Sequence, residues 1–219
     1  ALAVTAVLAC HMKREADVAA ELEFSRDSDE LRKIIAVRLD DHARILLAGA
    51  ALFNASDEVT RDEWRIFTQS QKLESQLPGI QSLGFSPLVS AAELPALLRR
   101  VRNEGFPEYT INPEGNRAAY APVVYIEPLS GRNLRALGRD NLADPVRRAA
   151  AEQARDMNGL ALSGKVTLAQ ETGQDLQVGV LMFTPLYRKG AAVDTVEQRR
   201  LAIVGWVSMA YRMHDLMDG

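Results

Sequence analysis

The stretch LQVGVLMFTPLYR, residues 176–188, is a short apolar run rich in β-branched and aromatic residues, and turn-forming residues flank it. Such a run is typical of a buried β-strand. Similar runs alternate with turns and helical patterns along most of the chain, which predicts an α+β module of about five or six strands. The other strand-like runs are IQSLGFSPLV (80–89), YTI (109–111), YAPVVYIEP (120–128), KVTLAQ (165–170) and RLAIVGWVSMAYR (200–212), and the helical patterns cover 91–103 and 144–157.

A long amphipathic helix is predicted ahead of this module. Residues 12–53 contain no proline, and Gly49 is their only glycine. Apolar residues recur at a spacing of three and four from Leu31 to Phe53, which is the spacing of one helix face. At 1.5 Å per residue the helix reaches about 60 Å, longer than a compact domain needs, so we interpret residues 11–57 as a stalk. The apolar stripe can serve a partner helix, the core of its own domain, or both.

The first ten residues, ALAVTAVLAC, are uncharged and almost wholly apolar. They are too few to cross a bilayer, which takes roughly 20 helical residues. The segment fits the end of a membrane helix, the tail of a signal peptide, a lipoprotein-like cleavage box before Cys10, or a buried helix turn. We favour the membrane helix, because the residues after Cys10 have the pattern of one continuous helix.

Two local patterns refine the elements. Thr60 and Glu63 have the spacing of a capping box, which predicts the start of a second helix. Asp144-Pro145 predicts the start of another, because Asp is a good N-cap and Pro suits the first helical position. The segment 189–200, KGAAVDTVEQRR, is the best candidate for a mobile loop.

Composition and motifs exclude several classes of function. A net charge of -3 provides no basic face for nucleic acid. The single cysteine permits no intrachain disulfide, and none of the three histidines stands at a metal-ligand spacing from a carboxylate. Gly159, Gly164 and Lys165 have the spacing of a phosphate-binding P-loop. Val166, however, occupies the position where that loop has a Ser or Thr hydroxyl. No nucleophile-base pair is recognisable, so we expect neither an enzyme nor a cofactor.

Polar and aromatic residues on the predicted strands are the candidate ligand site. On alternate strand positions they can line a mostly apolar cavity with a few fixed polar groups. For each residue the alternative is a filled core with tyrosines hydrogen-bonded at its edge. The candidate wall consists of Tyr120, Tyr125, Gln170, Phe183 and Tyr187. Asp140 can instead bond backbone amides in its turn, and Arg147 can pair with Asp140 or with a ligand carboxylate.

Five short segments and a closing strand resemble the CHASE domain, an extracytoplasmic sensor module of receptor-like histidine kinases and nucleotide cyclases. The five segments occur in the order of that family, from about residue 79 to 187, with the long helix before them and the closing strand after them. The segments are YAPVVYIEP, GRD at 138–140, DPVRRAAAEQARD from Asp144, KVTLAQE, VLMFTPLY and, after them, RLAIVGWVSMAYR.

The resemblance implies a stalk helix followed by tandem PAS-like domains with antiparallel sheets. In this scheme residues 1–10 end a membrane helix or signal segment, 11–57 form the stalk, and 58–190 form a membrane-distal PAS-like ligand-binding domain. Residues 191–219 form the membrane-proximal PAS-like part and the exit to a second membrane span. The resemblance also implies a homodimer through the stalk and a periplasmic domain of an inner-membrane protein.

The function predicted from this resemblance is a small-molecule sensor that passes ligand binding across the membrane without catalysis of its own. The alternative is a structural dimerisation spacer with no ligand. Cytokinin-binding members carry an acidic residue just before the YAPV strand, where this chain has Ala118 and Ala119. We therefore expect poor binding of adenine derivatives. We also expect Trp206, with Val204 and Val207, to bring the closing strand against the stalk helix.

Overall fold

The computed structural model describes residues 2–72, 79–171, 173 and 176–218 of the chain. The chain divides into two compact units, Ala1–Asp41 and His42–Gly219. Helix α1, Leu2–Ala55, supplies nearly all of the first unit, and its last residues, from His42, belong to the second. Among the residues described, no helix has the length and apolarity required to cross a membrane.

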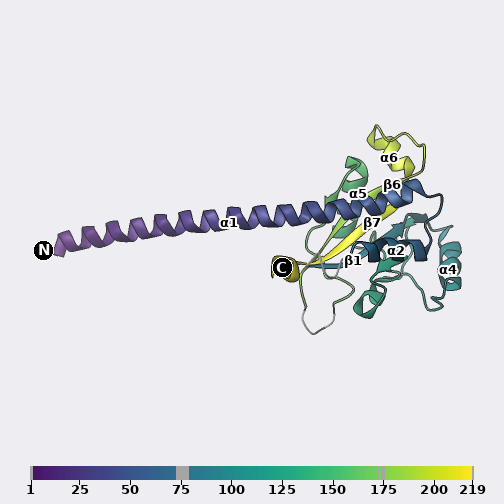
Figure 1. Cartoon of the computed structure of the whole chain (residues 1–219), viewed down its shortest axis with the longest axis horizontal. Coiled ribbons are helices and arrows are strands. Elements are labelled where there is room, and N and C mark those ends of the chain that lie inside the picture. Colours follow the sequence, from purple (N-terminus) through teal and green to yellow (C-terminus); the bar gives the residue numbers. More distant parts are fainter. Residues whose placement is uncertain (1, 73–78, 172, 174–175, 219) are drawn as a thin grey trace. The chain divides into compact units, whose positions relative to one another are not determined.

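The second unit is built on a five-stranded antiparallel sheet (Figure 1), in the order β4-β1-β7-β6-β5. A separate two-stranded ladder joins β2 to β3. This architecture confirms the predicted α+β class, with a long helix followed by an antiparallel sheet. The strands are β1 (Ile80–Pro87), β2 (Val89–Ser90), β3 (Ala119–Tyr120), β4 (Tyr125–Glu127), β5 (Ala161–Leu162), β6 (Gly179–Tyr187) and β7 (Ile203–Arg212).

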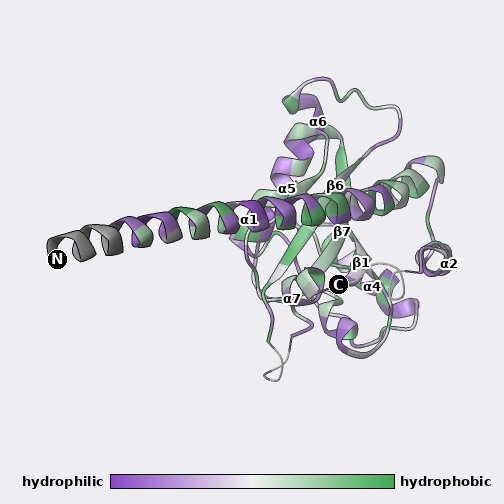
Figure 2. Ribbon diagram, turned by 60° about the vertical axis from the view of Figure 1, so that its left-hand side comes forward, coloured by the Kyte–Doolittle hydropathy of each residue, from purple (hydrophilic) through white to green (hydrophobic). Residues whose placement is uncertain are grey.

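Strand β7 lies at the centre of this sheet, hydrogen-bonded to β1 on one side and to β6 on the other. Figure 2 shows both β6 and β7 as hydrophobic over most of their length, which fits strands covered on both faces. Residues 203–212 therefore complete the same sheet as residues 80–187. The boundary that we predict near residue 190 does not separate two sheets.

The two faces of the sheet pack against different helices, because successive side chains of a strand point to opposite faces. On one face the ring centroids of Phe85 and of Phe53 in α1 lie 4.3 Å apart. On the same face the Tyr211 ring stacks on the His42 ring, with 5.5 Å between their centroids. The part of the apolar stripe within residues 42–53 is thus core of the second unit. The other face packs against helix α5 (Pro145–Met157).

Trp206 belongs to this second face. It is buried in one cluster with Ala150, Ala151 and Ala154 of α5, and its indole N–H donates to the Ala151 carbonyl at 2.8 Å. The expectation that Trp206 contacts the long helix is therefore wrong. Tyr211, on the opposite face of the same strand, makes that contact.

The remaining helices are short. Thr60 caps α2 through the predicted capping box with Glu63. A second capping box, formed by Thr195 and Gln198, starts a helix inside the segment that the sequence predicts as a loop. The bounds are α2 (Arg61–Ser70), α4 (Leu94–Asn103), the 3-10 helix η1 (Gly131–Ala136), α6 (Val196–Ala202) and α7 (Met213–Asp218).

Candidate functional site

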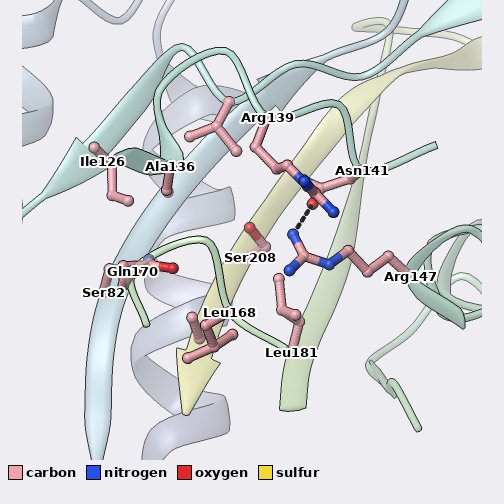
Figure 3. Close-up of a pocket in the computed structure, with 13 residues that line it drawn as sticks. Ser82, Ile126, Ala136, Arg139, Asn141, Arg147, Leu168, Gln170, Leu181 and Ser208 are labelled. Atoms are coloured by element: carbon pink, nitrogen blue, oxygen red, sulfur yellow. Dashed lines mark hydrogen bonds between the residues drawn. The ribbon is translucent and has the colours of Figure 1, made fainter. Parts of the chain in front are cut away.

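A small cavity lies on the α5 face of the sheet, over the centre of β1 and β7 (Figure 3). Its volume is about 20 Å³, which is room for about one water molecule. The strands, the segment 136–141, helix α5 and the segment 168–170 all contribute to its wall. The lining residues are Ser82, Gly84, Val123, Ile126, Ala136, Arg139, Asn141, Arg147, Leu168, Gln170, Leu181, Ser208 and Ala210.

Small side chains on the two central strands create this space. Gly84 of β1 stands opposite Ser208 of β7, and Ser82 stands opposite Ala210. A Cβ atom on Gly84 would come within 2.9 Å of the Tyr125 carbonyl oxygen, so the neighbouring strand excludes a larger residue there. Four small residues in adjacent positions leave a hollow that Leu or Phe would fill in an ordinary sheet core.

A tight turn carries Arg139 and Asn141 to the cavity. Gly138 has a φ of +77°, and a Cβ atom there would lie 1.8 Å from the Thr110 carbonyl oxygen, so only glycine fits. Asp140 fixes the turn from within. Its Oδ1 accepts hydrogen bonds from the amides of Ala121 at 2.8 Å and Leu142 at 3.0 Å, and its Oδ2 accepts one from Arg117 Nε at 2.9 Å.

Arg147 reaches the cavity from the first turn of α5. Asp144 caps this helix by accepting hydrogen bonds from the amides of Val146 and Arg147. The Arg147 side chain is only 4% exposed. Its Nη2 donates to the Thr167 carbonyl at 2.9 Å and its Nη1 to Asn141 Oδ1 at 3.5 Å, the contact drawn in Figure 3.

Two guanidinium groups are left incompletely paired at this site. The Nε atoms of Arg147 and Arg139 are both buried and find no hydrogen-bond partner among the residues that the structure describes. The nearest carboxylate oxygen to Arg147 Nε belongs to Asp144, at 4.0 Å. Burial, and then the charge of Arg139, lower the pKa of Arg147 to about 10. Arg147 is therefore still a cation at neutral pH, and the cavity wall holds two arginines without a carboxylate.

Gln170 closes the cavity at its other end, where its Nε2 donates to Ser82 Oγ at 3.2 Å. The next residue, Glu171, accepts a hydrogen bond from Arg212 Nε at 2.9 Å. Arg212 is the last residue of β7 and also pairs with Asp215 of α7 at 2.7 Å. The cavity wall is thus connected directly to the C-terminal end of the described chain.

Of the seven predicted site residues, the structure brings Arg147 and Gln170 together at the cavity. The Tyr120 hydroxyl accepts from the Arg117 amide and donates to the Gly115 carbonyl, and Asp140 fixes the turn through its two oxygens. Phe183 is fully buried in the α5 cluster, and Tyr187 donates to the Arg155 carbonyl at 2.6 Å. Tyr125 faces away from the cavity: its ring contacts Phe85 and its hydroxyl donates to the Val59 carbonyl.

The sequence reasoning missed Ser82, Arg139, Asn141 and Ser208. A local pattern does indicate Ser82. Small residues occupy alternate positions of β1, at Ser82, Gly84 and Ser86, which leaves space on one face of the sheet. Arg139 and Asn141 stand in a loop, and nothing local predicts that they approach the sheet. Within the described ranges no group of three or more His, Cys, Asp or Glu side chains is placed to hold a metal ion.

A family model described as the CHASE domain matches residues 57–219, which includes the sheet, the cavity and both of its arginines. No curated protein matches the chain.

Proposed function

The chain belongs to the CHASE domain family, and from this membership we propose that it is the extracytoplasmic small-molecule sensor of a membrane-bound receptor. The CHASE domain is an extracellular sensor domain of signalling receptors. The finer assignment is a periplasmic domain of an inner-membrane histidine kinase or nucleotide cyclase. The sensor domain passes ligand binding across the membrane and catalyses nothing itself.

The observation that carries this proposal is the cavity over the centre of the sheet. It combines apolar walls with a few polar groups, which is the composition of a small-molecule site. A ligand larger than water enters only if the wall moves. The segment 168–170 forms one side of that wall and directly precedes Glu171. Because Glu171 is paired with Arg212, a displacement of the segment also moves the partner of Arg212.

This connection supplies a route for the signal. A ligand shifts a two-state protein only by binding the two states with different affinity. Contact with Gln170 favours one position of the 168–171 segment, and the Glu171–Arg212 pair transfers that preference to the end of β7 and to α7. The stalk helix, as a dimer interface, is the second part of the proposed receptor.

The alternative function is a dimerisation spacer whose cavity holds only water. The small volume of the cavity, about 20 Å³, favours this alternative. A thermal-shift screen of a small-molecule library separates the two, since a compound that binds the folded state raises its Tm. The screen is run on the wild type and on two variants, Ser208→Val and Val204→Ile.

Ser208→Val fills the cavity, whereas Val204→Ile adds a methylene to the same strand at a position that is 40% exposed. For a sensor, at least one compound raises the Tm of the wild type and of Val204→Ile in a saturable manner, and Ser208→Val loses the response. Hits that Ser208→Val retains place the ligand elsewhere on the domain. The absence of any hit in a broad library supports the spacer.

A further inference from the structure

Arg147, the buried arginine of the cavity, is paired less closely than other arginines in the described part of the domain. Arg212 is paired with Glu171 at 2.9 Å, and Arg117 with Asp140 at 2.9 Å. Arg147 is as deeply buried as Arg212, yet its strong contact is a single carbonyl oxygen. Buried cations in proteins are normally paired, because an unpaired charge is costly to remove from water. The described wall of the cavity contains no carboxylate to pair with Arg147, and the ion pair with Asp144 outside the wall is long, at 4.0 Å.

Among the described residues, the nearest carboxylate to Arg147 is a distant one. Asp144 accepts the amides at the start of α5 through Oδ1, and its Oδ2 forms a long ion pair with Arg147 Nε at 4.0 Å, outside the cavity wall. Asp140 is adjacent to Arg139 in sequence, but its two oxygens are already bonded to Arg117 and to two amides. Both guanidinium groups keep a buried Nε–H without an acceptor, and Arg147 directs its group toward the cavity (Figure 3).

The wall has aliphatic side chains besides its polar groups. Arg139, Asn141 and Arg147 gather at one end, and Ile126 and Ala136 lie toward the other, beside the Gln170–Ser82 hydrogen bond (Figure 3). A fully hydrated inorganic anion gains nothing from the aliphatic side chains. An anion with a short hydrocarbon part matches both ends, because its charge meets the guanidinium groups and its carbons meet the aliphatic side chains.

We propose that the ligand of this cavity is a short-chain organic carboxylate, bound at its charged end by Arg147 and Arg139. This inference rests on the proposed function and specifies the ligand class of the same site. Guanidinium groups suit the carboxylate, since their planar N–H groups bind two oxygens side by side. The carboxylate takes the place of the long 3.5 Å contact between Arg147 and Asn141, and because the cavity of about 20 Å³ holds only a water, its binding requires the 168–170 side of the wall to move outward. Arg139 is partly exposed and marks the side from which the ligand enters.

The experiment compares matched probes on the intact 219-residue chain. Acetate, propionate, butyrate and pyruvate are titrated by calorimetry and thermal shift, beside propionamide and butyramide, propylamine, and inorganic phosphate and sulfate. At least one carboxylate is expected to bind saturably, and its amide of the same shape to bind at least tenfold more weakly, because the amide lacks the charge.

Variants test the assigned residues. Arg139→Gln and Arg147→Lys are each expected to weaken the carboxylate at least tenfold, whereas Arg148→Gln, exposed on the same helix, leaves its affinity unchanged. Arg147→Lys keeps the buried charge, so it tests the planar geometry without emptying the site. If Arg147→Lys fails to fold, Arg139→Gln and the amide comparison still decide the question.

Three results would overturn the inference, and they differ in what they leave of the proposed function. Equal binding of carboxylates and amides refutes the role of charge but keeps a sensor. Binding of phosphate or sulfate alone refutes the organic ligand and also keeps a sensor. If none of these probes binds, the inference is refuted as well, and the thermal-shift screen of the broad library then decides whether the sensor function falls with it.

Discussion

Glu127 is a buried carboxyl group with no basic partner in hydrogen-bond range among the described residues. It is the last residue of β4 and only 6% exposed, and its Oε2 accepts a hydrogen bond from the Leu129 amide at 2.9 Å. Burial raises the pKa of Glu127, and the hydrogen bond, together with the more distant charges of Arg65 and Arg61, opposes the effect only in part. The native state therefore holds this proton more tightly than the unfolded chain does.

The upward direction of the Glu127 pKa shift predicts how the stability of the native state depends on pH. The raised pKa means that ionisation of Glu127 costs native stability, and the loss develops as pH rises from the ordinary value near 4.5. Glu127→Gln keeps an acceptor for Leu129 and cannot ionise. We expect its Tm to exceed that of the wild type by a few degrees at pH 7 and to equal it near pH 4, in thermal unfolding followed by circular dichroism. A variant less stable than the wild type at pH 7 would show that the carboxylate is needed.

Individual site residues were the hardest feature to predict. Aromatic residues on strands often line cavities and therefore predict the tyrosines as part of the wall, but each of their hydroxyls is bonded to backbone. Arg139 reaches the cavity through the left-handed turn at Gly138 and its contact with Thr110. The position of Arg139 depends on contact between two segments that are separated in the sequence, so no local sequence pattern predicts it. Arg147 was accessible to prediction because it follows a helix start with a clear cap.

At the scale of an element, helix α5 is the support of Arg147. Asp144 supplies its N-cap and places negative charge at its positive end. Asp144→Ala leaves two amides of the first turn without this acceptor. We expect a loss of about 1 kcal/mol in the free energy of unfolding, measured by urea denaturation, and weaker ligand binding because Arg147 loses its fixed position.

Asp144→Asn is the matched control, since asparagine is also a good N-cap and keeps the side-chain oxygen. It should retain most of the stability that Asp144→Ala loses. If both variants lose the same amount, the charge of Asp144 near Arg147, and not the cap, holds this end of the helix.

Elements with local signals were predicted well. The capping box at Thr60 and the N-cap at Asp144 mark the helix starts at the positions that the structure shows. The helix α6 was missed, although Thr195 and Gln198 form the same type of capping box, because Gly190 and the small residues after it favoured a loop. The order of the strands in the sheet could not be predicted from the sequence, because β7 pairs with β1 across more than a hundred residues.

At the scale of the whole molecule, the first unit raises the question of what covers its apolar side chains. Met12, Val18, Leu22, Phe24 and Val37 are each more than half exposed, whereas Ala43, Leu46 and Ala50 are buried in the second unit. Partner chains normally cover such residues on long helices. The polar segment from Ser25 to Glu30 separates the apolar residues before it from the stripe that begins at Leu31, so we expect a weak, reversible dimer.

The dimer is tested by placing a charge at Ile35, which is partly exposed within the stripe of the first unit. Ile35→Asp is expected to shift the monomer-dimer equilibrium toward the monomer by at least tenfold in sedimentation equilibrium, because a carboxylate is costly to bury in an apolar seam. Ala36→Asp adds the same charge one position further around the helix, on an exposed residue, and should leave the dimer intact. Circular dichroism confirms that both variants fold. A dimer unaffected by Ile35→Asp would remove this helix from the interface, and loss of folding in that variant alone would make Ile35 part of the domain core.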